Sequence, residues 1–137
     1  MSLVDKLLQL DAGKLAEKPI KEVELKRLSK VLGTKAIFKC QAIDGQAYAD
    51  IQRRSIGISK RGDICDIDIY EMQVMTVLEG VVEPSFKDKK LLEHFNALTP
   101  KDLIKKMLLP GEIAELHNVV NELSGYERDD EEGEIKN

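Results

Sequence analysis

Apolar residues recur at offsets of three and four through the middle of the chain, and this pattern is the strongest periodic signal in the sequence. Its members are Ile67, Tyr70, Val74, Val77, Leu78 and Val81. The spacing predicts an amphipathic helix that opens among Asp63, Asp66 and Asp68 and ends at Glu83-Pro84. Because such a helix must bury its apolar face against other elements, we expect a largely helical core.

The last third of the chain predicts two more helices, which meet at Pro110-Gly111. Thr99-Pro100-Lys101-Asp102 starts the first of them, with Thr99 as the cap and Pro100 at the first helical position. Glu112 starts the second, and Gly125 follows its end. The residues expected to face inward are Leu103, Ile104, Met107, Leu108, Ile113, Leu116, Val120 and Leu123. A short helix from about Lys87 to Phe95 precedes this pair.

Two helices are predicted closer to the N-terminus. Asp44 can cap one that runs to about Gly57, with Tyr48, Ile51 and Ser55 on one side. The segment from Leu3 to Leu10 predicts a short amphipathic helix, which needs a partner surface to be stable at this length. Lys18-Pro19 then breaks the chain.

Residues 21–43 are the one stretch with strand character. Val23 and Leu25 alternate with charged neighbours. Ile37 and Phe38, which follow Gly33, lie among residues that favour a β-strand. Leu25, Leu28 and Leu32 would also suit a helix, so the first half is ambiguous. We interpret the stretch as a two-stranded hairpin, which needs helices to cover one face.

The predicted fold is therefore α+β: a mostly helical single domain of about five helices with one N-terminal antiparallel β-hairpin. The domain should cover residues 1–126, with a helical N-terminal arm (1–18), the hairpin (21–43) and the helices (44–125). The last eleven residues, 127–137, carry six acids and two bases, which accounts for the whole net charge of −4. We expect this acidic tail to be disordered.

Composition limits the classes of partner. Residues 1–126 carry nineteen acids and nineteen bases, so the broad basic surface of a nucleic-acid-binding protein is not expected. There is no Trp, and only three Tyr and three Phe, so a partner surface should be aliphatic. With no signal-like leader, no membrane-length apolar run and two lone cysteines, we expect a soluble intracellular protein without membrane contact.

No catalytic, metal-binding or cofactor-binding motif stands out, and we expect no enzyme activity, metal or cofactor. Asp63, Asp66, Asp68 and Glu71 are better explained as acids at the positive end of a helix than as metal ligands. His94 and His117 lack convergent partners, and Arg61-Gly62-Asp63 is interpreted as a turn. Lys101, Lys105 and Lys106 form a basic patch, either a solvated face or a contact for an acidic partner segment.

The C-terminal half resembles the phage tail assembly chaperones of the XkdN-like family. The resemblance rests on LTPKDLIKKMLLPGEIAEL (98–116), on NELSGY (121–126) and on LEGVVEPSF (78–86), where the family has a segment of the form LEGVxxPxF. In the family a helix of the form LxKKxLLPGE follows that segment. The upstream stretch KEVELKRLSKVLG…FKCQAI is similar to the family's N-terminal region.

The resemblance implies a chaperone that binds the tape measure protein, keeps it soluble and helps to bring the tail tube protein to it. It implies action in the host bacterial cytoplasm and absence from the mature virion. A longer, frameshifted form of the chain is a further partner that the resemblance suggests. The alternatives are a structural tail-accessory subunit retained in the particle and a small prophage adaptor or regulatory protein.

The candidate partner-binding surface is the predicted C-terminal helical pair. Its residues are Leu103, Lys106, Met107, Leu109, Pro110, Gly111, Glu112 and Leu116. The segment Leu109 to Glu112 has two readings: a tight junction, in which Pro110 stops one helix and Glu112 starts the next, or the end of a binding groove. An aliphatic groove that receives amphipathic helices would suit a long helical partner.

Overall fold

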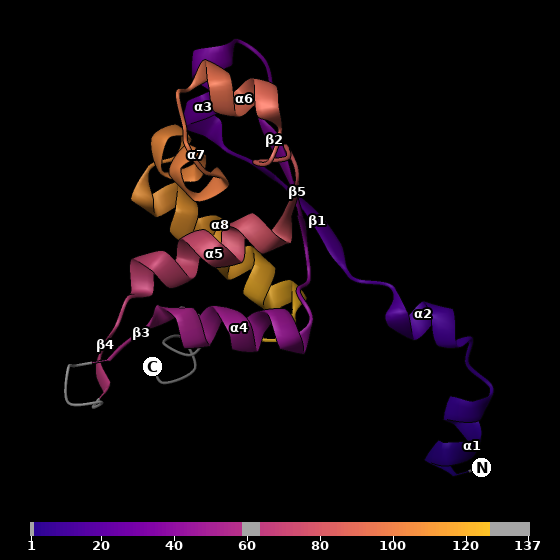
Figure 1. Cartoon of the computed structure of the whole chain (residues 1–137). Helices are drawn as coiled ribbons and strands as arrows, with labels where there is room; N and C mark the ends of the chain where they lie inside the picture. Colours follow the sequence, from indigo (N-terminus) through magenta and orange to yellow (C-terminus); the bar gives the residue numbers. More distant parts are fainter. Residues whose placement is uncertain (1, 59–63, 127–137) are drawn as a thin grey trace, which may run out of the picture.

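The computed structural model describes residues 2–58 and 64–126. Within these ranges, residues 57, 58 and 64–67 are described by their backbone only. This part of the chain contains eight helices, a three-stranded sheet and a separate pair of short strands (Figure 1). The helices are α1 (Leu3–Leu8), α2 (Ala12–Ala16), α3 (Lys26–Leu32), α4 (Gly45–Ser55), α5 (Ile69–Gly80), α6 (Lys89–His94), α7 (Pro100–Met107) and α8 (Pro110–Leu123). The strands are β1 (Ile20–Glu24), β2 (Ile37–Gln41), β3 (Ile56–Ile58), β4 (Ile64–Ile67) and β5 (Val81–Glu83).

Strand β2 is the centre of the larger sheet, whose order is β1-β2-β5 with both pairings antiparallel. Val23 of β1 lies opposite Phe38, and Val81 of β5 lies opposite Cys40. Side chains of a strand alternate between its two faces. Phe38 and Cys40 accordingly face inward and are buried, whereas their neighbour Ile37 is exposed. The sheet therefore contributes one apolar face to the core.

Helices α5, α7 and α8 supply most of the remaining core. Their fully or almost fully buried side chains are aliphatic, as the scarcity of aromatics requires: Val74, Val77, Leu103, Ile104, Ile113, Leu116, Val119 and Val120. Phe38 and Phe86 lie in the same cluster, with ring centroids 6.3 Å apart. Helix α5 packs along α8, and α8 also contacts β1 and β2, so the C-terminal helix joins the helical layer to the sheet.

The predicted fold, with about five helices and one N-terminal β-hairpin, is wrong. Strands β1 and β2 do pair antiparallel, but a helix, α3, connects them, and β5 extends the sheet on the other side of β2. The predicted strand ran through Leu28, whereas β1 ends at Glu24. Leu25, Leu28 and Leu32 follow the helical alternative, and Gly33 (φ 76°) ends α3 in the left-handed conformation that glycine tolerates.

The long central helix is also shorter than predicted at both ends. Residues Ile64–Ile67 pair with β3 as a strand, and α5 begins after Asp68, whose side chain accepts a hydrogen bond from the Glu71 N–H (3.0 Å). At the other end, Val81–Glu83 leaves the helix and pairs with β2. Both Val81 and Val82 are β-branched and suit a strand, but helical periodicity alone could not reveal that β2 offers a free edge.

Several predicted helix boundaries are confirmed. The Asp44 carboxylate accepts a hydrogen bond from the Ala47 N–H (2.8 Å) at the start of α4. The Thr99 hydroxyl accepts one from the Asp102 N–H (3.1 Å) at the start of α7. Gly125 has φ 101° just after α8. These signals are local in sequence, which is why they could be predicted without knowing the tertiary fold.

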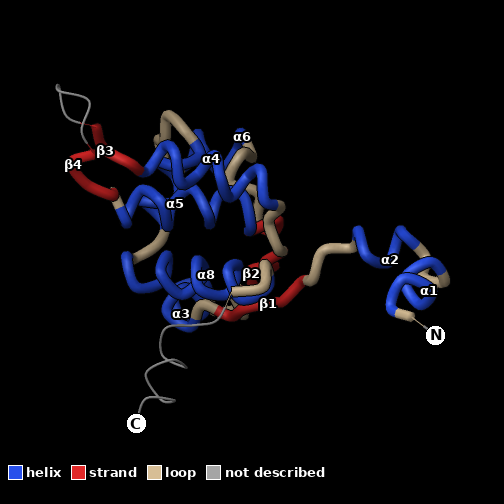
Figure 2. The backbone as a smooth tube through the Cα atoms, turned by 90° about the horizontal axis from the view of Figure 1, so that it is seen from below, coloured by secondary structure: helices blue, strands red, loops and turns tan. Residues whose placement is uncertain are grey.

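The N-terminal arm, formed by α1 and α2, stands away from the rest of the molecule in both backbone views (Figures 1 and 2). Neither helix contains a buried residue. Its apolar side chains are exposed, among them Leu3, Leu7, Leu8 and Leu15. The predicted tail, residues 127–137, lies outside the described residues, as does the predicted turn at Arg61-Gly62-Asp63.

Candidate protein-binding groove

An open apolar groove of about 810 Å³ lies between α3 on one side and α6 and α7 on the other. Strands β2 and β5 contribute to its lining through Ile37, Phe38 and Glu83. The apolar lining residues are Leu28, Val31, Leu32, Ala36, Ile37, Phe38, Pro84, Leu91, Phe95 and Met107. Figure 1 shows α3 and α6 at the same end of the molecule, and Figure 2 shows them apart, as two walls of one groove would be.

The side chains of α3 are the most exposed part of this surface. Val31 is 72% exposed and Leu32 is 62% exposed, although both are large aliphatic residues. Ile37 and Phe95 are also exposed, whereas Leu28, Leu91 and Met107 are half-buried and pack against the core. Contiguous exposed apolar surface of this kind marks a site for another molecule.

Backbone and side-chain hydrogen bonds hold α3 in place between the two strands. The Leu25 N–H donates to the Ala36 carbonyl oxygen (3.0 Å), which closes the connection at its base. The Ser29 hydroxyl accepts from the Ala36 N–H (2.9 Å) and lies 2.8 Å from Glu24 Oε2. Because these bonds fix both ends of the connection, α3 presents a defined wall rather than a mobile loop.

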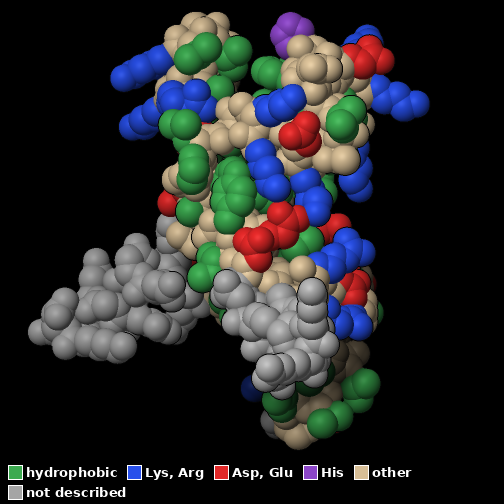
Figure 3. Space-filling view, turned by 60° about the vertical axis from the view of Figure 1, so that its left-hand side comes forward, with side chains coloured by type: hydrophobic (Ala, Val, Ile, Leu, Met, Phe, Trp, Pro, Cys, Tyr) green, Lys and Arg blue, Asp and Glu red, His purple; other side chains and the backbone are tan. Residues whose placement is uncertain are grey.

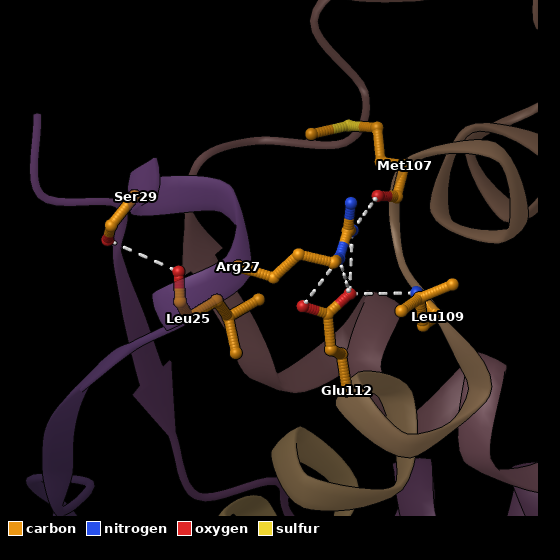
Figure 4. Close-up of polar contacts among 6 residues, drawn as sticks. All are labelled: Leu25, Arg27, Ser29, Met107, Leu109 and Glu112. Atoms are coloured by element: carbon orange, nitrogen blue, oxygen red, sulfur yellow. Dashed lines mark hydrogen bonds and ion pairs between the residues drawn. The ribbon is translucent and has the colours of Figure 1, made fainter. Parts of the chain in front are cut away.

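Arg27 joins the α3 wall to the α7–α8 junction (Figure 4). Its guanidinium donates to both Glu112 carboxylate oxygens, with Nη2–Oε1 at 2.8 Å and Nε–Oε2 at 3.1 Å. Nη2 also donates to the Met107 carbonyl oxygen (2.9 Å), the last residue of α7. A bidentate arginine–carboxylate pair has fixed geometry, so this contact sets the position of α3 relative to the two C-terminal helices.

Glu112 serves two structural purposes at once. Its Oε1 also accepts a hydrogen bond from the Leu109 N–H (2.8 Å), which satisfies a donor at the start of α8. Partial burial raises the pKa of the Glu112 carboxyl, but the hydrogen bonds from Arg27 and Leu109 and the Arg27 charge lower it more, so the pKa lies below its ordinary value. The Leu109–Glu112 segment is thus part of a helix junction, but Pro110 begins α8 rather than stopping α7, which ends at Met107, and Glu112 is the third residue of α8.

The residues predicted to bind a partner fall into three environments. Lys106 and Met107 line the groove, and Glu112 contacts its Arg27. Leu109, Pro110 and Gly111 are exposed at the junction. Leu103 and Leu116 are completely buried in the core. These two can support the groove from beneath but cannot touch a partner in this conformation.

Sequence reasoning missed the α3 wall. Leu25, Leu28 and Leu32 do suit a helix, but the hairpin interpretation favours a strand there, and Val31 is not part of the predicted pattern. Phe95 and Ile37 reach the groove from elements far away in sequence. No local pattern could have placed them together, since their proximity depends on the sheet and on the packing of α6.

The basic patch consists of Lys101, Lys105 and Lys106, and these lysines form ion pairs and hydrogen bonds within the chain. Lys101 Nζ lies 2.5 Å from Glu71 Oε1, and Lys105 Nζ lies 3.3 Å from Glu71 Oε2. Lys106 Nζ donates to the Asn96 carbonyl oxygen (2.7 Å). The hydrogen bond from Lys101, followed by the contributions of Lys105, holds the pKa of Glu71 below its ordinary value. The patch therefore ties α7 to the start of α5.

The other polar candidates have structural explanations in the part of the chain that is described. Asp68 caps α5 and Glu71 pairs with α7, while the side chains of Asp63 and Asp66 lie outside the described residues. Over residues 2–58 and 64–126, no group of three or more His, Cys, Asp and Glu side chains could hold a metal ion. His94 packs edge-on against Phe95, and His117 Nε2 lies 3.2 Å from Asn121 Nδ2.

A groove with exposed aliphatic walls is typical of proteins that receive an amphipathic helix of a partner. The family model for phage XkdN-like tail assembly chaperone proteins matches residues 4–136, and this chain belongs to that family. The family is one of chaperone-type phage proteins and not an enzyme family. In the described residues, no helix has the length and apolarity that a bilayer crossing requires.

A solved structure has the same general fold. A crystal structure of the protein YqbN is similar with a TM-score of 0.58 and 24% sequence identity, over 79% of this chain and 87% of that chain. At this identity the likeness concerns the fold alone. The comparison with curated proteins found no match.

Proposed function

We propose that this tail assembly chaperone binds the tape measure protein, keeps it soluble and promotes assembly of the tail tube around it. The observation that carries the proposal is the open groove, whose α3 wall exposes Val31 and Leu32 to solvent. A tape measure protein is a long helical chain with apolar stripes, and an aliphatic groove is the surface that receives such a helix. The tail tube protein and a longer frameshifted form of the chain are the further partners we propose.

Co-expression with the tape measure protein of the same phage tests the groove directly. We expect the wild-type chain to move the tape measure protein from the insoluble to the soluble fraction. A Val31→Asp/Leu32→Asp variant should lose this effect while its far-UV circular dichroism stays normal, because both side chains are exposed. Leu98→Asp is the matched control, since Leu98 is 92% exposed and lies outside the groove lining.

Met107 is a weaker site for this test than α3. It lines the groove but also packs against the core, so Met107→Glu would place a charge partly in an apolar environment. A folding defect would then mask any binding defect. If the wild-type chain solubilises no tape measure segment at all, the proposed role is wrong. If the Val31→Asp/Leu32→Asp variant solubilises it as well as the wild type does, the groove is not the site.

We further propose that the chain acts in the host bacterial cytoplasm and is absent from the mature virion. Mass spectrometry of purified particles checks this, because a structural tail subunit would be found in a fixed ratio to the tube protein. Detection in such a ratio would favour the tail-accessory alternative over the chaperone.

A further inference from the structure

The groove end of the molecule carries a charge opposite to that of the rest. The two stretches that line the groove, residues 27–38 and 83–107, contain nine Lys and Arg and four Asp and Glu, a net charge of +5. The remaining residues contain twelve bases and twenty-one acids, a net charge of −9. Arg27, Lys101 and Lys105 pair with Glu112 and Glu71 outside these stretches, so the positive excess near the groove comes from the remaining lysines.

The basic side chains around the groove are mostly available to a partner. Lys30, Lys35, Lys87, Lys89 and Lys90 are exposed, and none of them forms an ion pair within the described residues. Of the four acids of the same stretches, Asp88 and Asp102 have partners, whereas Glu83, which lines the groove, and Glu93 form no ion pair within the described residues. Asp88 caps α6 by accepting hydrogen bonds from the Lys90 and Leu91 N–H groups, and Asp102 lies 3.6 Å from Lys106 Nζ. Five lysines and three acids of these stretches, Asp88 among them, are thus without an ion pair in the described part of the chain, and the balance is positive.

These positive side chains belong to the two parts of the chain that carry the groove walls. Lys30 and Lys35 belong to the α3 side, and Lys87, Lys89 and Lys90 to the α6 side. The space-filling view shows Lys and Arg side chains spread over the upper part of the molecule, among hydrophobic ones (Figure 3). Of these five lysines (the rim lysines), Lys35 lines the groove itself, and the others lie in or beside the segments that form its walls.

We propose that the groove selects acidic amphipathic helices: segments of a partner protein with one apolar face flanked on both sides by Asp and Glu. The apolar face packs on Leu32, Ile37 and Phe95, and the flanking carboxylates pair with the rim lysines. The inference deepens the proposed function, since it rests on the groove being the site that holds a partner chain. Charge complementarity of this type affects partner specificity and the association rate more than it affects the affinity.

The apolar lining distinguishes this occupant from two others with negative charge. A nucleic acid would place phosphates and stacked bases against the site, yet its walls are aliphatic, and Phe38, almost completely buried, and Phe95 are the aromatic residues among the lining. The chain's own segment 127–137 carries a net charge of −4 but has Ile135 as its one large apolar residue, too little to cover the groove.

The test uses two synthetic helical peptides of about 18 residues, or five turns, with the same leucine face and either glutamate or lysine on both flanks. Binding to the full-length chain is measured by fluorescence anisotropy at low and at physiological salt. We expect the glutamate peptide to bind at least about tenfold more tightly than the lysine peptide at low salt. The ratio should shrink as salt rises, because the rim charges are exposed.

Charge reversal at the rim provides the decisive variant. Lys35→Glu/Lys87→Glu/Lys89→Glu should invert the preference between the two peptides, and the exposure of all three lysines makes a folding defect unexpected. Lys6→Glu/Lys14→Glu, on the distant N-terminal arm, is the matched control and should leave the preference unchanged. Equal binding of the two peptides, or a preference that survives the rim reversal, overturns the proposal.

Two further outcomes would also overturn it. A short DNA duplex that competes more strongly than the glutamate peptide would assign the groove end to nucleic acid. A severalfold gain in peptide affinity on neutralising Asp129, Asp130, Glu131 and Glu132 to their amides would assign it to the chain's own tail. Failure of the proposed function would give a different result from failure of the charge inference. In the first case Val31→Asp/Leu32→Asp would not change the binding of either peptide. In the second case this variant would still weaken peptide binding.

Discussion

Gly80 at the end of α5 lies directly against Val120 in α8, so close that a β-carbon at position 80 would come 2.5 Å from Val120 Cγ2 and 2.7 Å from Cγ1. Both positions are buried. Gly80→Ala should therefore push α5 away from α8 and lower the free energy of unfolding by about 1–3 kcal/mol. Urea denaturation measures this, and Val120→Ala in the same chain should restore part of the loss.

Gly111→Ala is the matched control for this prediction. Gly111 is exposed within α8, and no atom outside its own helix backbone and chain neighbours lies within 4 Å of its hypothetical β-carbon. Alanine there should raise the free energy of unfolding, by roughly 0.4–1 kcal/mol, because it restricts the unfolded chain without a clash. Equal effects of the two substitutions would show that close packing at Gly80 is not limiting.

The Arg27–Glu112 pair should be energetically coupled. A double-mutant cycle with Arg27→Met and Glu112→Gln is expected to give a favourable coupling free energy, small because the bidentate pair is partly solvated. Arg27→Lys should not rescue the coupling, because an ammonium group cannot reproduce the forked contact with Glu112 and the Met107 carbonyl. A coupling indistinguishable from zero would mean that the contact does not position α3.

Acid should weaken the fold through two carboxylates. The pKa values of Glu71 and Glu112 lie below the ordinary value of 4.5 in the folded chain. Their contribution to stability is therefore complete above the ordinary pKa and is lost as the pH falls through the lowered one. The free energy of unfolding should drop between about pH 5 and pH 3, and less steeply in a Glu71→Gln/Glu112→Gln variant. Parallel curves for the two proteins would contradict this assignment.

Deletion of the N-terminal arm should leave the rest of the fold intact. Residues 2–18 include no buried side chain, and their contact with the body through Lys18 and Asp44 is a 4.0 Å ion pair between exposed groups. A chain that starts at Pro19 should keep its midpoint of urea unfolding, because a pair of this kind contributes little. Pro19 stays in place because its carbonyl oxygen accepts a hydrogen bond from the Ala42 N–H.

Deletion of residues 127–137 tests the predicted disordered tail, which lies outside the described residues. The segment carries one large apolar side chain, Ile135, and a run of like charges, so we expect it to be dispensable for folding. Differential scanning calorimetry should show a change in melting temperature of less than about 5 °C. A larger drop would indicate that the tail docks on the body.

The sequence was most informative where structure depends on neighbours along the chain. Asp44, Thr99 and Gly125 mark helix ends through bonds or dihedral angles within a few residues, and all three were predicted correctly. The prediction failed at Val81–Glu83, whose strand exists only because β2 lies beside it, and at Leu28–Leu32, where two periodicities competed. The resemblance identified the family, but the sequence could not predict the groove, because the groove depends on how α3, α6 and α7 are arranged in the tertiary structure.

The order of the groove walls along the chain has a consequence for synthesis on the ribosome. The α3 wall is made first, but its counterparts in β5, α6 and α7 end at Met107, and Arg27 receives its carboxylate partner only at Glu112. Because a chain emerges from its N-terminus onward, most of it must be translated before the groove exists. On the proposed function, a nascent copy of this chain therefore cannot bind its client until translation has passed Glu112.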